Sequence, residues 1–299
     1  MSQLQLDHRK GLLITGIGGL ILTADIPLLR LGEGETWSTL LLRSTTTFVT
    51  AIVIWILWSL AAGKRRPLVP GAIGYAVAAL YGLSSITFMI AVYNTKTANL
   101  VFILALNAVF SALLSWIFLK ERPKPVTFIA MFLMLIGVSI IVREGLSSGH
   151  LFGDLIALLS TFILASAITV TRASKKDMGF AAILGTALPM LVAVFMVSQN
   201  GYSVGAPGWI IFNGAVVTTI AFLCLATGPK FISGPEVAMF YLLETVLAPI
   251  WVWMIFAERP TNPTLVGGVI IITALIGHSL WQMFHTRRLA RLMSLSHPI

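Results

Sequence analysis

Long runs of apolar residues follow one another along almost the whole chain, separated by short polar or proline-containing stretches. A bilayer core about 30 Å thick needs about 20 apolar residues per helix, and ten runs meet or approach that length. We therefore predict an all-α integral membrane protein with ten transmembrane helices, at residues 11–29, 37–62, 68–92, 97–119, 126–142, 151–171, 179–198, 208–228, 235–257 and 264–284.

Two similar segments close the fourth and ninth predicted helices. FLKERPKP begins at Phe118 and FAERPTNP begins at Phe256, so that Glu121 and Glu258 stand 137 residues apart. A repeat at about half the chain length indicates two related halves of five helices each, at residues 1–145 and 146–299. Because five is odd, the second half enters the membrane from the side opposite to the first. Such inverted repeats recur in secondary transporters.

The Glu-Arg-Pro motif itself has two interpretations. Proline interrupts a helix, and Glu and Arg favour the water interface, so the motif is expected to act as a structural stop. The other interpretation is a role in gating.

The composition supports a membrane protein. Hydrophobic residues make up 57% of the 299 residues and charged residues only 10%, against about 25% in soluble domains. The net charge of +9 is explained by the loops: fifteen basic residues lie on the side of the N-terminus, and only Arg30, Lys96, Arg143 and Arg259 lie on the other. The positive-inside rule then predicts that both termini are cytoplasmic, and the excess charge requires no nucleic acid partner.

The paired LKERPKP and AERPTNP segments, together with ten helices and the half-chain repeat, resemble the EamA-type members of the drug/metabolite transporter superfamily. The segment from Gly74 to Phe118 most resembles the bacterial aromatic amino-acid exporters of that superfamily, and RSTTTF at 43–48 resembles their Arg-containing second helix. The second half, however, has no clear counterpart of Arg43.

This resemblance implies a secondary-active exporter of small organic metabolites, above all aromatic or hydrophobic amino acids, in the bacterial inner membrane. It implies alternating access and no cofactor. We expect a monomer whose partners are a small-molecule substrate and the lipid bilayer. The alternative within transport is an exporter of lipophilic cations, and a channel or scaffold would not explain inverted halves.

Acidic side chains inside a span are functional candidates because they are costly in lipid. Glu244 lies deepest in the chain, in the ninth predicted helix, and Phe240 shares its helical face with Tyr241 beside it. Glu244 is predicted to bind a substrate ammonium group or a proton. The structural alternative is a buried carboxyl that bonds to a neighbouring helix.

Further substrate-binding candidates lie on the third and fourth predicted helices. Tyr81, Ser85 and Phe88 would offer aromatic faces and a hydroxyl to an amphipathic solute, and Asn99 and Asn107 fall on one polar row. Helix packing and interhelical hydrogen bonds are the alternatives for all five.

Three charged residues are candidates for gating or ion pairing. Asp25 is expected to pair with Lys96 or with Arg43, and Arg43 could instead bind a substrate carboxylate or extend to the interface.

Catalytic and metal sites are not expected. The GLSSG stretch at 145–149 fits G-x-S-x-G, but it lies in a short loop between spans and not at a strand–helix turn. His278 stands alone in the tenth predicted helix, and the single Cys224 lies within the eighth. We therefore predict that the protein is not an enzyme.

Overall fold

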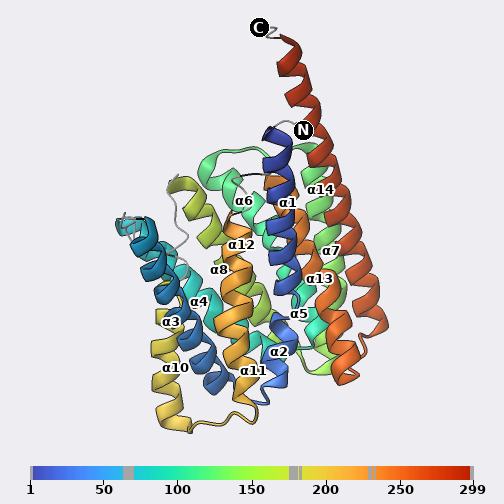
Figure 1. Cartoon of the computed structure of the whole chain (residues 1–299). Coiled ribbons are helices and arrows are strands. Elements are labelled where there is room, and N and C mark those ends of the chain that lie inside the picture. The colour runs from blue at the N-terminus through green and yellow to red at the C-terminus, as the bar shows by residue number, and fades with distance from the viewer. Residues whose placement is uncertain are drawn as a thin grey trace.

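The computed structural model describes residues 3–62, 71–174, 181, 184–227, 231 and 234–296. Within its helices, the side chains of residues 3–8, 62, 147–148, 226–227, 234–239, 241–242 and 285–296 lie outside this description. The described residues are all-helical and contain no strand, apart from an isolated antiparallel bridge between Gly34 and Val204. Figure 1 shows one bundle in which the first helix begins and the last helix ends at the same end, called here the termini end.

The helices follow the predicted spans closely. In chain order they are α1 (Gln3–Leu22), α2 (Asp25–Leu31), α3 (Thr36–Ala62), α4 (Ala72–Asn94), α5 (Thr97–Leu104), α6 (Asn107–Leu119), α7 (Pro125–Ser148), α8 (Leu151–Ser174), α10 (Ala187–Asn200), α11 (Pro207–Phe212), the π-helix η1 (Asn213–Thr218), α12 (Thr219–Thr227), α13 (Gly234–Phe256) and α14 (Asn262–Ser296).

Eight of the predicted spans correspond to helical segments long and apolar enough to cross a membrane. The other two, predicted at 179–198 and 235–257, overlap the shorter apolar helices 187–200 and 243–256 among the described residues. The protein is thus a multi-pass, all-helical membrane protein. Lipid can satisfy no backbone N–H or C=O, so each span must bond internally as a helix.

The first span is broken between α1 and α2. Pro27 has no N–H to offer the carbonyl of Thr23, four residues earlier, and its ring disfavours a continuous helix there. The backbone tightens instead, with Thr23 N–H bonded to Leu20 C=O at 3.2 Å and Ala24 N–H to Ile21 C=O at 3.1 Å. Asp25 therefore begins a new helix inside the span, a break that hydropathy did not predict.

The fourth and ninth predicted spans end in the same way. α6 and α13 stop immediately before Lys120 and Ala257, which both adopt left-handed conformations, with φ of 57° and 53°. After α6, the N–H groups of Lys120 and Glu121 both reach the carbonyl of Ser115, which satisfies an orphan acceptor of the last turn. The helices thus end before the Glu-Arg-Pro motif, at a left-handed cap, within one residue of the predicted ends at 119 and 257.

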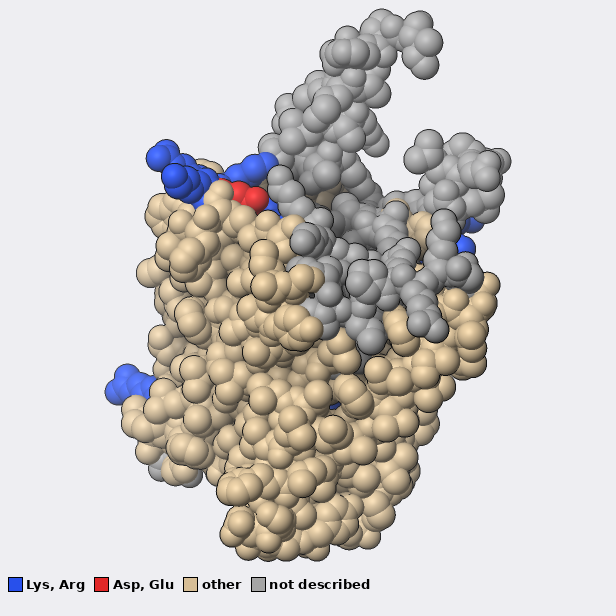
Figure 2. Space-filling view, turned by 90° about the vertical axis from the view of Figure 1, so that its left-hand side faces the viewer, with Lys and Arg blue, Asp and Glu red and all other residues tan. Residues whose placement is uncertain are grey.

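The outside of the bundle is apolar. Large side chains such as Leu60, Phe118 and Met254 are about 70% exposed, at 75%, 73% and 69%. Figure 2 shows a face that is almost free of charge along its length, with Lys and Arg gathered mainly at the termini end. This is the surface expected where acyl chains replace water.

Small residues set how closely the helices approach. A Cβ on Gly137 of α7 would lie 2.7 Å from the carbonyl oxygen of Gly267 of α14, and the reverse substitution meets the same obstacle. Such glycine contacts allow backbones to pack against each other in membranes, where burial of apolar surface gives little driving force between helices.

Candidate functional site

A buried ion pair lies inside the bundle. Asp25 is the first residue of α2 and Arg43 lies in α3, and their side chains are only 4% and 11% exposed. The guanidinium nitrogen Nη2 of Arg43 donates to both carboxylate oxygens of Asp25, at 2.8 and 2.9 Å. Because the α1–α2 break puts Asp25 at a helix start, its carboxylate lies where the partial positive charge of a helix N-terminus also favours an anion.

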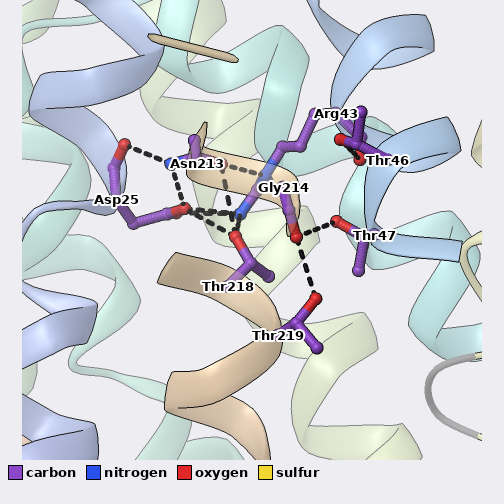
Figure 3. A network of polar contacts seen from close by, with 8 residues as sticks. All are labelled: Asp25, Arg43, Thr46, Thr47, Asn213, Gly214, Thr218 and Thr219. Atoms are coloured by element: carbon purple, nitrogen blue, oxygen red, sulfur yellow. Dashed lines mark hydrogen bonds and ion pairs between the residues drawn. The ribbon is translucent and has the colours of Figure 1, made fainter. Parts of the chain in front are cut away.

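The π-helix η1 completes this network, as Figure 3 shows. Asn213 donates from Nδ2 to the backbone carbonyl and to Oδ1 of Asp25, both at 2.9 Å, and accepts from Arg43 Nε at 3.1 Å. Thr218 donates from Oγ1 to Asp25 Oδ1 at 3.2 Å. We call Asp25, Arg43, Asn213 and Thr218 the central cluster.

The π-helical winding explains how two residues five positions apart serve one site. The wider turn brings Thr218 Oγ1 within 3.2 Å of Asn213 Oδ1, and it lets Thr219 Oγ1 donate to Gly214 C=O at 2.9 Å. Thr47 of α3 donates to the same carbonyl at 3.1 Å. Single π turns within α-helices occur frequently at functional sites, and here the turn supplies half of the central cluster.

Close packing of η1 against α3 holds the central cluster together. A Cβ on Gly214 would lie 2.7 Å from the carbonyl oxygen of Arg43 and would overlap Thr46 Oγ1. Only a glycine therefore allows the π turn to approach the arginine-bearing helix.

Glu244 of α13 lies near the central cluster without belonging to its hydrogen-bond network. It is half-buried and interacts electrostatically with both Asp25 and Arg43. Among the described residues, no side chain bonds or ion-pairs with it. Since Asp25 and Arg43 neutralise each other, Glu244 is the acid at this site whose charge has no fixed counterpart.

The ring of Phe88 borders the charge of Arg43, and a second ring, that of Phe240, lies one helical turn from Glu244. The ring centroid of Phe88 in α4 lies 5.4 Å from the guanidinium carbon of Arg43, in cation–π range. Phe240, one turn before Glu244, packs on α1, where a Cβ on Gly16 would lie 3.1 Å from its ring. The site thus combines an ion pair, a lone acid and aromatic faces contributed by α2, α3, α4, η1 and α13.

Several predicted site residues lie elsewhere. Tyr81 packs against the small buried cluster of Val77 and Ala181, which Val170 of α8 also contacts. Ser85 is half-buried on α4 and makes no contact with the central cluster that the structure records.

Three further predicted site residues are Asn107, Lys96 and Tyr241. Asn107 opens α6 and accepts from Ser111 at 3.4 Å. Lys96 pairs with Glu144 of α7, with Nζ and Oε1 3.5 Å apart, so Asp25 has Arg43 and not Lys96 as its partner. The side chain of Tyr241 lies outside the described residues.

A second buried cluster was not anticipated from the sequence. Asp154, in the first turn of α8, is fully buried and accepts from the hydroxyl of Thr95 and, at 3.5 Å, from Asn99 Nδ2. Asn99 Oδ1 in turn accepts from Thr264 Oγ1 of α14 at 2.8 Å. We call these four residues the end cluster. An acid within the sixth predicted span was the signal for it.

Other chemistry has little support in the described part of the chain. No group of three or more His, Cys, Asp or Glu side chains there is placed to hold a metal ion. Thr127 of α7 shares a 3.0 Å hydrogen bond with His278 Nε2, which joins two helices.

Comparison with known proteins gives a consistent result. The model of the EamA-like transporter family matches the chain twice, at residues 9–143 and 151–280. An uncharacterized transporter of Synechocystis is 24% identical over 243 residues, which cover 74% of this chain and 64% of that protein. Uncharacterized transporter YdfC of Bacillus subtilis is 28% identical over 188 residues, covering 60% of this chain and 61% of YdfC. The chain therefore spans less than two thirds of the length of these two relatives.

A protein of known crystal structure supports the fold alone. It aligns with 89% of this chain and 96% of its own length at a TM-score of 0.62, with 17% identical residues. Because the family model matches both halves of the sequence and covers most of it, this protein belongs to the EamA-like transporter family.

Proposed function

We propose that this transporter is a secondary-active exporter of small organic metabolites, with aromatic or hydrophobic amino acids as its substrates, in a bacterial inner membrane. The observation that carries the proposal is Glu244, a half-buried acid with no bonded partner among the described side chains, near a buried Asp25–Arg43 ion pair and the ring of Phe88. Charged groups inside a membrane are costly, and substrate or ion pathways are their usual reason.

Alternating access by two inverted repeats of five helices is the mechanism we propose. The family model matches each half separately, and successive spans run in opposite directions through the bundle (Figure 1). On this proposal α1 and α8, the first helices of the two halves, enter from opposite sides, and both termini are cytoplasmic. Exchange of the two halves' conformations would open a central site to each side in turn.

An amino acid would bind through both of its charges. Glu244 would accept the ammonium group, and the substrate carboxylate would compete with Asp25 for the guanidinium of Arg43, whose fork geometry suits a carboxylate. The rings of Phe88 and Phe240 would contact an aromatic side chain, for which offset or edge-to-face contact is favourable. Binding would then loosen the 2.8 Å Asp25–Arg43 bond that joins α2 to α3.

A lipophilic monocation is the second candidate substrate. One observation favours it: the charge of Arg43 is already neutralised by Asp25, so that among the described side chains Glu244 is the acid left for a cation. A cation would need only that carboxylate and aromatic faces.

Flux measurements with vesicles that contain the purified protein test both candidates. Labelled tryptophan and a quaternary-ammonium dye would be followed with and without a pH gradient, for the wild type and for Glu244→Gln. We expect one of these solutes to be transported and the Gln variant to lose at least about tenfold of that flux. Glu35→Gln, at an exposed loop acid, is the matched control and should retain the flux. Unchanged rate and affinity in Glu244→Gln for a transported solute would contradict the proposal.

A further inference from the structure

We propose that two ion pairs, Arg30–Glu258 and Arg172–Glu121, are equivalent connections between the two halves, one at each end of the bundle, and that they are exposed or broken in alternation. This proposal rests on the proposed alternating-access function and names the residues that control it.

The Arg30–Glu258 pair is partly buried. Nη1 of Arg30 lies 2.5 Å from Oε2 of Glu258, and the two side chains are 22% and 23% exposed. Nη2 of Arg30 also donates to the backbone carbonyls of Val92, at 3.3 Å, and Thr95, at 3.0 Å. The other carboxylate oxygen of Glu258 accepts from Thr97 N–H at 2.9 Å. The pair therefore ties α2 and the end of α13 to the α4–α5 junction.

The Arg172–Glu121 pair is more exposed. Arg172 lies in the last turn of α8, and Glu121 follows α6. Nη2 of Arg172 lies 2.8 Å from Oε2 of Glu121, and the side chains are 62% and 47% exposed. Exposed pairs are screened by water and contribute little, whereas loss of one partner from a buried pair is costly. The two pairs thus have the same chemistry but different environments.

The four residues occupy equivalent positions in the two halves. The family matches begin at residues 9 and 151, and Arg30 and Arg172 each stand 21 residues further on. Glu121 and Glu258 both precede Arg-Pro and both follow a residue in the left-handed conformation. The same two positions of the repeat therefore form both pairs.

Each pair joins one half to the other. Arg30 of the first half meets Glu258 of the second, and Arg172 of the second half meets Glu121 of the first. α2 and the C-terminal end of α13 lie at the end of the bundle opposite the termini, whereas α6 and α8 run toward the termini end (Figure 1). One pair thus connects the halves at each end.

If the two halves exchanged conformations, the two ion pairs would exchange their partly buried and exposed environments. The Arg30–Glu258 pair would become exposed or break as its end opened, and the Arg172–Glu121 pair would become buried as the termini end closed. A role confined to anchoring helix ends predicts something different, because either pair could then be lost without a directional change.

Matched neutral variants separate these two roles. Spin labels would be attached to cysteines in a Cys224→Ser background, with Glu35→Cys and Asn262→Cys spanning one end and Arg122→Cys and Ala173→Cys spanning the termini end. All four sites are exposed, and each label pair has one member in each half. We expect Glu258→Gln to raise the population of long distances between residues 35 and 262 several-fold, and Glu121→Gln to do so between residues 122 and 173.

The charge swap Arg30→Glu with Glu258→Arg should restore the wild-type distances. Opening of the same end of the bundle by both Glu258→Gln and Glu121→Gln, or no shift in either label pair, would overturn the proposal. Because distances are measured without a substrate, this outcome is independent of whether tryptophan or the dye is transported. If neither solute is transported in the flux assay, the proposed function is contradicted. The spin-label distances would still test the proposal about the two ion pairs.

Discussion

The central cluster and the end cluster are both buried sets of polar side chains, but their charges are balanced in different ways. In the central cluster the carboxylate of Asp25 meets the full charge of Arg43, and Glu244 lies nearby with no bonded partner among the side chains that the structure describes. In the end cluster the buried Asp154 is held by neutral donors, the hydroxyl of Thr95 and the amide of Asn99.

This difference indicates different roles. The carboxylate of Asp154, at the start of α8, accepts from neutral donors, and the end cluster in this way joins α4, α5, α8 and α14. Neutralising Asp154 would weaken these hydrogen bonds but would not abolish them. A compensated ion pair beside an uncompensated acid can respond to a charged solute, because the solute can replace one partner. We therefore propose packing as the role of the end cluster and binding as the role of the central cluster with Glu244.

The largest effect on stability is expected from Asp25→Asn. It leaves the Arg43 guanidinium buried without a counter-charge, and loss of one partner of a buried pair costs about 3–5 kcal/mol. Thermal unfolding in detergent measures the loss, and the double variant Asp25→Asn with Arg43→Gln should recover more than half of it. The comparison fails if Asp25→Asn is no less stable than Asp154→Asn.

Gly214→Ala is expected to cost about 1–3 kcal/mol, as overpacking of a tight contact does, because the added methyl group meets the backbone of α3 at Arg43. Gly208→Ala, where a Cβ has no neighbour within 4 Å, is the matched control. Unfolding midpoints of the two variants give the difference. Equal midpoints would mean that close approach of η1 to α3 does not stabilise the central cluster.

Asp154→Asn is expected to cost about 1–2 kcal/mol, because the amide keeps one acceptor for Thr95 but faces the amide of Asn99 with a second donor. Transport should be retained, which a combined flux and unfolding measurement on one preparation would determine. A complete loss of flux in a variant that remains folded would move the end cluster into the transport pathway.

Glu244→Gln should have the smallest effect on stability, within about 0.5 kcal/mol, since no described side chain bonds to it. The same variant is expected to lose transport, so that at this position flux falls without a matching loss of stability. Destabilisation comparable to that of Asp25→Asn would instead indicate a structural carboxyl.

Much of the fold could be predicted because the bilayer restricts the choices. A backbone in lipid must bond within its own helix, so the apolar runs gave helices such as α3 and α8 with ends within a few residues of those observed. The π turn at 213–218 and the break before Asp25 were not predicted, because both depend on local geometry within a run whose hydropathy is uniform.

The site was predictable only in its parts. Glu244, Arg43 and Asp25 were identified because charged residues are rare in apolar runs, but the choice of Arg43 over Lys96 as the partner of Asp25 depends on helix packing. Asn213 gave no comparable signal, since polar uncharged residues are common in membrane helices.

The sequence by itself determined an all-helical membrane protein with a repeated half, because hydrophobic length and recurring motifs are properties of the chain. Only the tertiary structure decided which charges meet: Arg43 with Asp25, Arg30 with Glu258, and Arg172 with Glu121. The physical reason is that an ion pair depends on a few ångströms between helices distant in sequence, and that distance is set by packing of side chains that are individually interchangeable.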